Sequence, residues 1–135
     1  MVLVEDEHTD FVDAMRMIVD MYPDVVYKPR SNFYFYDDGN PSCLFGHVFH
    51  QLGITLHDIF EALNSKLNYV NEAAVPNPNN ARVRFVLKSL GYTENFRFCA
   101  EVAQILQDEK KKWSEVLEAF RLELVRHGIA DMYWR

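Results

Sequence analysis

Hydrophobic residues recur every three or four positions near the start of the chain, and this spacing predicts an amphipathic helix. Thr9 or Asp10 can cap it, because a short polar side chain accepts hydrogen bonds from unpaired backbone N–H groups. Pro23 ends it, since a proline ring disfavours helical backbone at the preceding residue. The stripe consists of Phe11, Met15, Ile18 and either Met21 or Tyr22.

Two short runs of β-branched and aromatic residues follow, a composition typical of strands. They occupy residues 25–28 and 33–36, with Pro-Arg-Ser-Asn between them and Asp-Asp-Gly-Asn following at 37–40 as the connection to the next helix. A four-residue loop of this kind predicts an antiparallel β-hairpin. Two strands alone are marginally stable in water, so we expect the hairpin to pack on helices.

A similar tetrapeptide occurs twice, Leu-Gly-Ile-Thr at 52–55 and Leu-Gly-Tyr-Thr at 90–93. Glycine suits the left-handed position after a helix, and threonine suits the N-cap of the next helix. Each copy therefore predicts a helical hairpin. The predicted helices span 42–52 and 56–69 in the first hairpin and 80–90 and 94–109 in the second, with 77–80 as a linker that supplies a cap.

The last third of the chain carries an apolar repeat of about seven residues from Cys99 to Leu124. One helix over 94–127 would satisfy it, but helices of that length are rare in small domains. We therefore favour a break within 108–113, with Ser114 capping a final helix that Gly128 ends. The predicted fold is mainly α, a single domain over 1–135. It has five or six helices, which form two helical hairpins plus a terminal helix, and one short two-stranded antiparallel β-hairpin.

Composition fits one soluble domain. The chain has 135 residues, of which 49% are hydrophobic and 14% aromatic, enough material for a core rich in rings. No apolar run approaches the roughly 20 residues that span a bilayer, and acidic residues open the chain where a secretory signal has basic ones. We therefore expect a cytoplasmic protein without a membrane anchor, in which Cys43 and Cys99 are reduced thiols.

Charge is distributed unevenly along the chain. Residues 1–81 carry four Lys or Arg against twelve Asp or Glu, whereas residues 82–135 carry ten against eight. The net charges are −8 and +2, so the two parts can attract each other. The plainer interpretation is two solvated faces, because charge balance bears on solubility more than on fold.

The helix predicted at 42–52 carries Cys43, His47 and His50. Cys43 lies in the first turn, where unpaired N–H groups and the helix dipole favour a thiolate. His47, four residues on, shares its face, which is the geometry a Cys–His nucleophile pair needs. No third group that would orient the histidine is identifiable. The alternative is a small core cysteine beside a satisfied polar histidine, so we assign no catalytic residue.

The same three residues can also be read as metal ligands, since zinc takes nitrogen and sulfur donors. His57 and Asp58, early in the next helix, could reach back across the turn. Ligands at i, i+4 and i+7 of one straight helix diverge along its axis, however, and the usual paired Cys-x₂-Cys is missing. We therefore expect no metal and no cofactor.

Basic residues suggest a further alternative. Arg82, Arg84 and Lys88 line one predicted helix, and three lysines occupy 110–112. Helical hairpins with basic residues are compatible with weak nucleic-acid binding. The isoelectric point near 5.3 argues against it, because domains that bind nucleic acid are usually strongly basic. Glycine-rich phosphate loops, His-Glu zinc motifs and Gly-x-Ser-x-Gly elbows are absent from the sequence.

One set of motifs resembles a known group of proteins. Tyr-Phe-Tyr at 34–36, Pro-Ser-Cys-Leu-Phe-Gly-His-Val at 41–48 and Leu-Gly at 52–53 are followed by Gln104, Gln107-Asp108 and Trp113. This pattern is similar to small uncharacterised proteins of actinobacteria and actinobacterial phages, over residues 25–120. The resemblance implies a bacterial or phage cytosolic context, and no catalytic residues follow from it.

The tail carries Met132, Tyr133 and Trp134 just before the last residue, Arg135, and this apolar composition predicts docking on the domain or on a partner. With no catalytic set, an acidic first helix and this tail, the sequence favours a non-enzymatic interaction protein that binds a protein partner or a second copy of itself. A small Cys/His-centred enzyme or metal-binding protein is the alternative, and a weak nucleic-acid binder is the further one.

Overall fold

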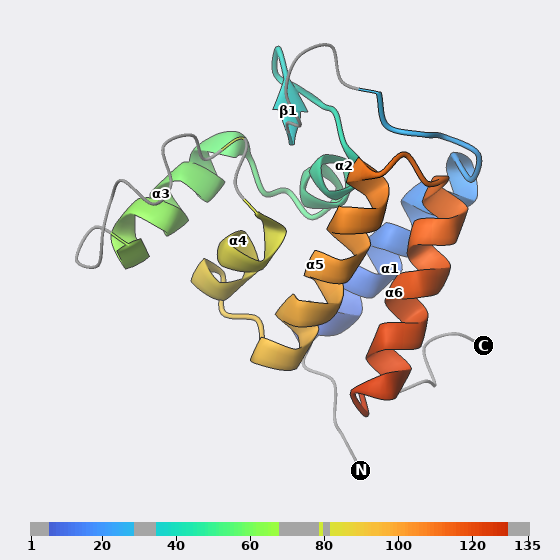
Figure 1. Cartoon of the computed structure of the whole chain (residues 1–135). Coiled ribbons are helices and arrows are strands. Elements are labelled where there is room, and N and C mark those ends of the chain that lie inside the picture. The colour runs from blue at the N-terminus through green and yellow to red at the C-terminus, as the bar shows by residue number, and fades with distance from the viewer. Residues whose placement is uncertain (1–5, 29–34, 68–78, 80–81, 130–135) are drawn as a thin grey trace.

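Helices form most of the computed structural model, which describes residues 6–28, 35–67, 79 and 82–129 (Figure 1). The helices are α1 (Asp6–Met21), α2 (Leu44–Gln51), α3 (Leu56–Leu67), α4 (Val83–Ser89), α5 (Glu94–Asp108) and α6 (Trp113–Arg126), and the strands are β1 (Tyr36–Asp37) and β2 (Asn40–Pro41). The expected class is confirmed, mainly α with one short antiparallel sheet. No helix in these ranges is long and apolar enough to cross a membrane.

Helix α1 begins at Asp6, a few residues earlier than the capping residues predict. It buries Phe11, Met15 and Ile18 of the expected stripe, whereas Met21 and Tyr22, the candidates for its last position, are 54% and 46% exposed. Phe11 is fully buried at the centre of an aromatic cluster. Rings from α2, α5, α6 and the turn before α5 lie 5.3 to 6.3 Å from the Phe11 ring, namely Phe45, Phe49, Tyr92, Phe96 and Phe120. Aromatic rings bury large areas, so this cluster joins four segments of the chain into one core.

The two predicted turns form as expected. Gly53 and Gly91 have φ of 77° and 95°. In each turn the glycine N–H donates to the carbonyl three residues earlier, and the next N–H donates to the carbonyl five residues before it, at 2.8 to 3.1 Å. These bonds satisfy carbonyls that the helix end leaves unpaired. Each repeated tetrapeptide therefore ends one helix and starts another.

The break between α5 and α6 is confirmed, but its capping residue is not the predicted one. Helix α5 ends at Asp108, Lys110 adopts φ of 69°, and Lys112 is the N-cap of α6 in place of Ser114. The Lys112 N–H donates to the Glu115 carboxylate at 3.0 Å. Ser114 N–H donates to the carbonyl of Pro23 at 3.0 Å. The segment after α1 therefore pairs the start of α6, a contact that no local pattern shows.

The predicted β-hairpin is in the wrong place. The antiparallel pair is β1 with β2, closed by Asp38 and Gly39 with φ of 54° and 82°. Two positive φ values make this a type I′ turn, for which Asp-Gly is a preferred sequence. The prediction used these residues as a connection after the hairpin, and the two-residue loop closes the sheet instead.

Val26 also finds a different partner from the predicted one. It forms an isolated antiparallel bridge with Lys112 at the start of α6. Part of the predicted second strand and its loop, residues 29–34, lies outside the described residues. Phe35 and Tyr36 hydrogen-bond to Asn79, whose carbonyl, side-chain oxygen and side-chain nitrogen engage them at 2.7 to 3.0 Å. Asn79 therefore aligns β1 and does not cap α4, whose N-cap is Arg82.

Candidate functional site

Cys43 lies at the N-cap of α2 and is buried, with 3% of its surface exposed. The Gly46 N–H donates to its Sγ at 3.4 Å. Burial raises the pKa of the Cys43 thiol to about 12, although hydrogen bonds from backbone N–H groups lower it in part. Because the thiolate is the nucleophile, this protonated thiol gives the Cys–His hypothesis little support.

The two histidines of α2 turn toward different neighbours. The His47 ring lies 5.4 Å from the Trp113 ring and 6.2 Å from the Tyr22 ring, and burial lowers the pKa of His47. His50 is exposed, with its ring 6.5 Å from that of Tyr36. Each imidazole therefore has its own aromatic surroundings, as the divergence along the helix axis predicts.

The remaining metal candidates are occupied by local contacts. His57 Nε2 lies 3.5 Å from the Glu61 carboxylate. Asp58 accepts a hydrogen bond from the Thr55 N–H at 2.9 Å, while the Thr55 hydroxyl accepts one from the Asp58 N–H. Within the described ranges, no three or more His, Cys, Asp or Glu side chains converge to hold a metal ion. The Cys43, His47 and His50 spacing thus produces no ligand cluster there.

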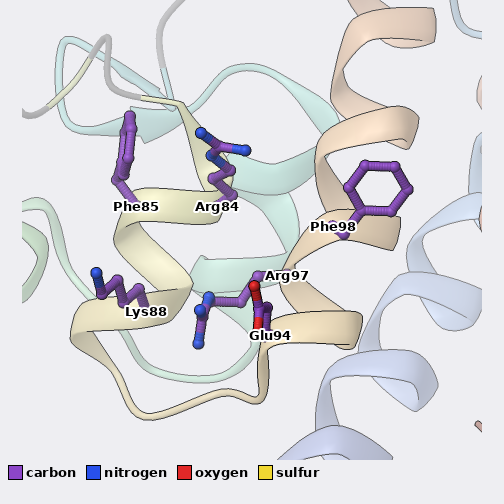
Figure 2. A pocket seen from close by; sticks show the side chains of 6 residues that line it. All are labelled: Arg84, Phe85, Lys88, Glu94, Arg97 and Phe98. Atoms are coloured by element: carbon purple, nitrogen blue, oxygen red, sulfur yellow. The ribbon is translucent and has the colours of Figure 1, made fainter.

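A groove lies between α4 and α5, on either side of the Gly91 turn (Figure 2). Its volume is about 260 Å³. The turn folds α5 back along α4, so side chains one helical turn apart on each helix face a common space. The groove is lined by three basic, one acidic and two aromatic residues, namely Arg84, Lys88, Arg97, Glu94, Phe85 and Phe98.

Two of the three cations are held in place by the fold. Arg84 Nε lies 3.0 Å from the Glu101 carboxylate, and its guanidinium lies 5.1 Å from the centre of the Phe85 ring. The Arg97 guanidinium donates to the Tyr92 carbonyl at 2.7 Å. A side chain fixed in advance loses less entropy when it binds, so both guanidinium groups are prepared for a further contact.

The other groove residues are more open. Lys88 is exposed and forms no ion pair within the part of the chain that the structure describes. Phe98 is 45% exposed, although its ring also lies 5.3 Å from the His127 ring. Glu94 is exposed near the start of α5. The groove thus combines a solvated cation, an exposed ring and one carboxylate beside the two fixed arginines.

The sequence pattern singled out two of the six residues that line this groove. It placed Arg84 and Lys88 on one helix, four residues apart, but it missed Arg97 and Phe98 on α5. The predicted hairpin of 80–90 and 94–109 could have indicated Arg97 and Phe98, because a helical hairpin brings its two helices side by side. Arg82 was predicted with the same stripe, but it faces Glu101 at 3.8 Å and does not line the groove.

The other predicted surfaces are the lysine run at 110–112 and the apolar tail. In the run at 110–112, Lys112 Nζ lies 3.9 Å from the Asp24 carboxylate, beside the start of α6. Met132, Tyr133 and Trp134 lie outside the described residues. Comparison of the chain with protein-family models, with curated proteins and with solved structures finds no match.

Proposed function

We propose that this chain is a non-enzymatic interaction protein that binds a protein partner through the groove between α4 and α5. The observation that carries the proposal is the combination of preset guanidinium groups with a partly exposed ring. Arginine and aromatic residues are the types enriched where protein interfaces concentrate their binding energy. The groove therefore has the composition of a protein contact.

The size of the groove separates a protein partner from a small-molecule ligand. Sites that enclose drug-sized ligands or cofactors measure roughly 300 to 1,000 Å³ and are mostly apolar. At about 260 Å³ this groove lies below that range, and half of its lining residues are basic. It fits one or two side chains that project from a larger surface, so a macromolecular partner is the better match.

Nucleic-acid binding and a catalytic function have less support than binding to a protein. The net charge of −6 repels a long phosphate backbone, and Arg82 and Arg84 both face the carboxylate of Glu101. The Cys/His-centred alternative rests on Cys43, whose pKa is raised to about 12. A bacterial or phage cytoplasmic context, which the resemblance of the 41–48 motif implies, stays part of the proposal.

Site-specific photo-crosslinking tests this proposal. A benzophenone amino acid is placed at Lys88 in the groove and, as a matched control, at the exposed Lys111 outside it. Irradiation in a lysate of the source organism should produce a discrete crosslinked protein from position 88 only. Adding Arg84→Glu should remove that species. Equal crosslinking at both positions, or none at position 88, would contradict the proposed function.

A further inference from the structure

We infer that the partner in the groove is a second copy of this chain, which inserts the outer face of its helix α1. This inference rests on the proposed function and names the partner. It depends on two surfaces that each copy carries, the groove between α4 and α5 and the acidic outer face of α1, defined by Asp13, Met17 and Asp20.

The outer face of α1 combines acidic and apolar side chains. Asp13, Met17 and Asp20 are all exposed and lie four and three residues apart, so they share one side of the helix. Met17 is 48% exposed and the next methionine, Met21, is 54% exposed. Methionine adapts to irregular surfaces and contacts aromatic rings favourably, so this face has the properties of a contact surface.

The groove and this face have opposite charge and matching apolar centres. Arg84, Lys88 and Arg97 lie around the groove, where Arg84 also faces Glu101 and the carboxylate of Glu94 lies nearby. On α1, two carboxylates about 10 Å apart along the helix flank the exposed Met17, beside the half-buried Arg16. Docking would bring the carboxylates to the cations and the thioether to the exposed Phe98 ring.

The two surfaces of one copy do not meet. The residues of α1 that face the core include Phe11, Met15 and Ile18, all buried, so the acidic face points away from the rest of the domain. In Figure 1, α4 lies to the left of α5, whereas α1 lies behind α5 and α6. Helix α1 of the same copy therefore does not fill the groove, and a second copy supplies an acidic and apolar helix face of the required kind.

Net repulsion between two copies does not prevent this contact. Each chain carries −6, but at about 0.15 M salt charges are screened beyond roughly 8 Å. Ion pairs at the contact act over shorter distances and are screened less. We therefore expect association at moderate ionic strength and weaker association as salt rises toward about 1 M, where screening reaches about 3 Å.

A charge-exchange experiment with the full chain tests the inference. Sedimentation velocity over a concentration series should show a dimer in equilibrium with monomer. Lys88→Glu and Asp13→Lys should each weaken the dimer by about tenfold or more. A mixture of the two variants should restore it, because every contact in the mixed dimer again joins opposite charges. Lys111→Glu and Glu109→Lys, exposed positions outside both surfaces, are the matched controls and should leave it unchanged.

Each other outcome contradicts self-association through these surfaces. A monomer at about 500 µM, far above the range of specific dimers, would do so, as would a dimer that Lys88→Glu leaves intact. Mixing that fails to restore the dimer would also overturn the pairing, provided that circular dichroism shows both variants folded. If the chain stays monomeric while position 88 crosslinks to a different protein, the proposed function survives and the second copy is excluded.

Discussion

The Gly53 and Gly91 turns have the same geometry, yet the helices that they join are arranged differently, since in the described segments α5 packs along α4 whereas α3 packs on α4 and not along α2. Both turns have glycine at positive φ and the same pair of closing hydrogen bonds. Helix α5 of the second hairpin then enters the core, where Phe96, Cys99, Ala100, Ala103 and Gln107 are buried. Among the described side chains of α3, Ile59 and Leu63 are buried, whereas Phe60 is 48% exposed and Leu56 is 36% exposed. Two turns with the same backbone geometry can therefore be followed by helices that are buried to different extents.

The helices that precede the two turns differ at most matching positions, and one of these differences explains their surroundings. Seven residues before the turn glycine, α2 has Gly46 and α4 has Arg84. A Cβ built on Gly46 would lie 1.8 Å from the backbone oxygen of Phe35. Arg84 instead projects into the groove. This position is thus covered by the backbone of Phe35, just before β1, in one helix and lines a candidate interface in the other.

Gly46→Ala should reduce the unfolding free energy more than any other substitution proposed for these helices and turns. Alanine normally favours a helix over glycine, but here its methyl group would overlap backbone that cannot rotate away. We expect a loss of about 3 kcal/mol or more in unfolding free energy, at the upper end for overpacking. Arg84→Ala at the matching position of α4 should cost about 1 kcal/mol or less. Denaturant unfolding of both variants measures the difference, and equal costs would contradict the close packing of α2 on Phe35.

Asp108 and Asp58 extend the comparison, because the fold shifts the pKa values of their carboxyl groups in opposite directions. Burial raises the pKa of Asp108, at the end of α5, from 3.8 to about 6, with a partly opposing hydrogen bond from the Gln107 side chain. The folded state therefore holds this proton more tightly than the unfolded state, so its contribution favours folding at low pH and is lost as pH rises through about 6. Asp58, at the start of α3, has its pKa lowered by hydrogen bonds from Thr55.

Asp108→Asn should stabilise the protein near neutral pH by about 1–2 kcal/mol, because it removes a half-buried charge and keeps an oxygen that can accept from Gln107. The gain should vanish below about pH 4, where the wild-type group is protonated. Asp58→Asn should act in the opposite direction, with a loss at neutral pH. Denaturant unfolding over this pH range tests both variants. A pH-independent effect of Asp108→Asn would contradict the raised pKa.

Gly53→Ala and Gly91→Ala should have nearly equal effects. A Cβ at either glycine would have no heavy atom within 4 Å, so only the positive φ opposes the substitution. We expect each to cost about 1 kcal/mol or more. Thermal and denaturant unfolding measure the two costs. Unequal losses would show that the surroundings of the two turns, and not only their backbone, set the energy.

The smallest effects concern the threonines that follow the glycines. The Thr55 side chain is in a reciprocal cap with Asp58, whereas the Thr93 hydroxyl lies 3.4 Å from His8 Nε2 of α1 and makes no cap hydrogen bond. Thr55→Ala should cost about 0.5–1 kcal/mol, typical of a lost N-cap. Thr93→Ala should cost less, about a few tenths, since its contact is long. The reverse order would contradict the difference in capping.

The sequence predicted the features that depend on neighbouring residues. The buried stripe of α1, the positive φ of Gly53 and Gly91 and the break before α6 all follow from spacing or from backbone preferences within a few residues. An Asp-Gly pair also carried a correct turn signal, although the prediction assigned those residues to a connection. Such signals act locally, so they are readable without the fold.

Tertiary structure decided which segments meet. Val26 pairs with Lys112, Asn79 aligns β1, and burial of the Cys43 thiol at the N-cap of α2 favours the core cysteine over the reactive thiol, a choice that the local pattern left open. The groove likewise needs α4 and α5 on both sides of a turn, together with Glu101 to hold Arg84. These contacts join residues that are distant in sequence or on separate helices. Their geometry depends on how whole helices pack against the shared core, and local sequence preferences do not encode it.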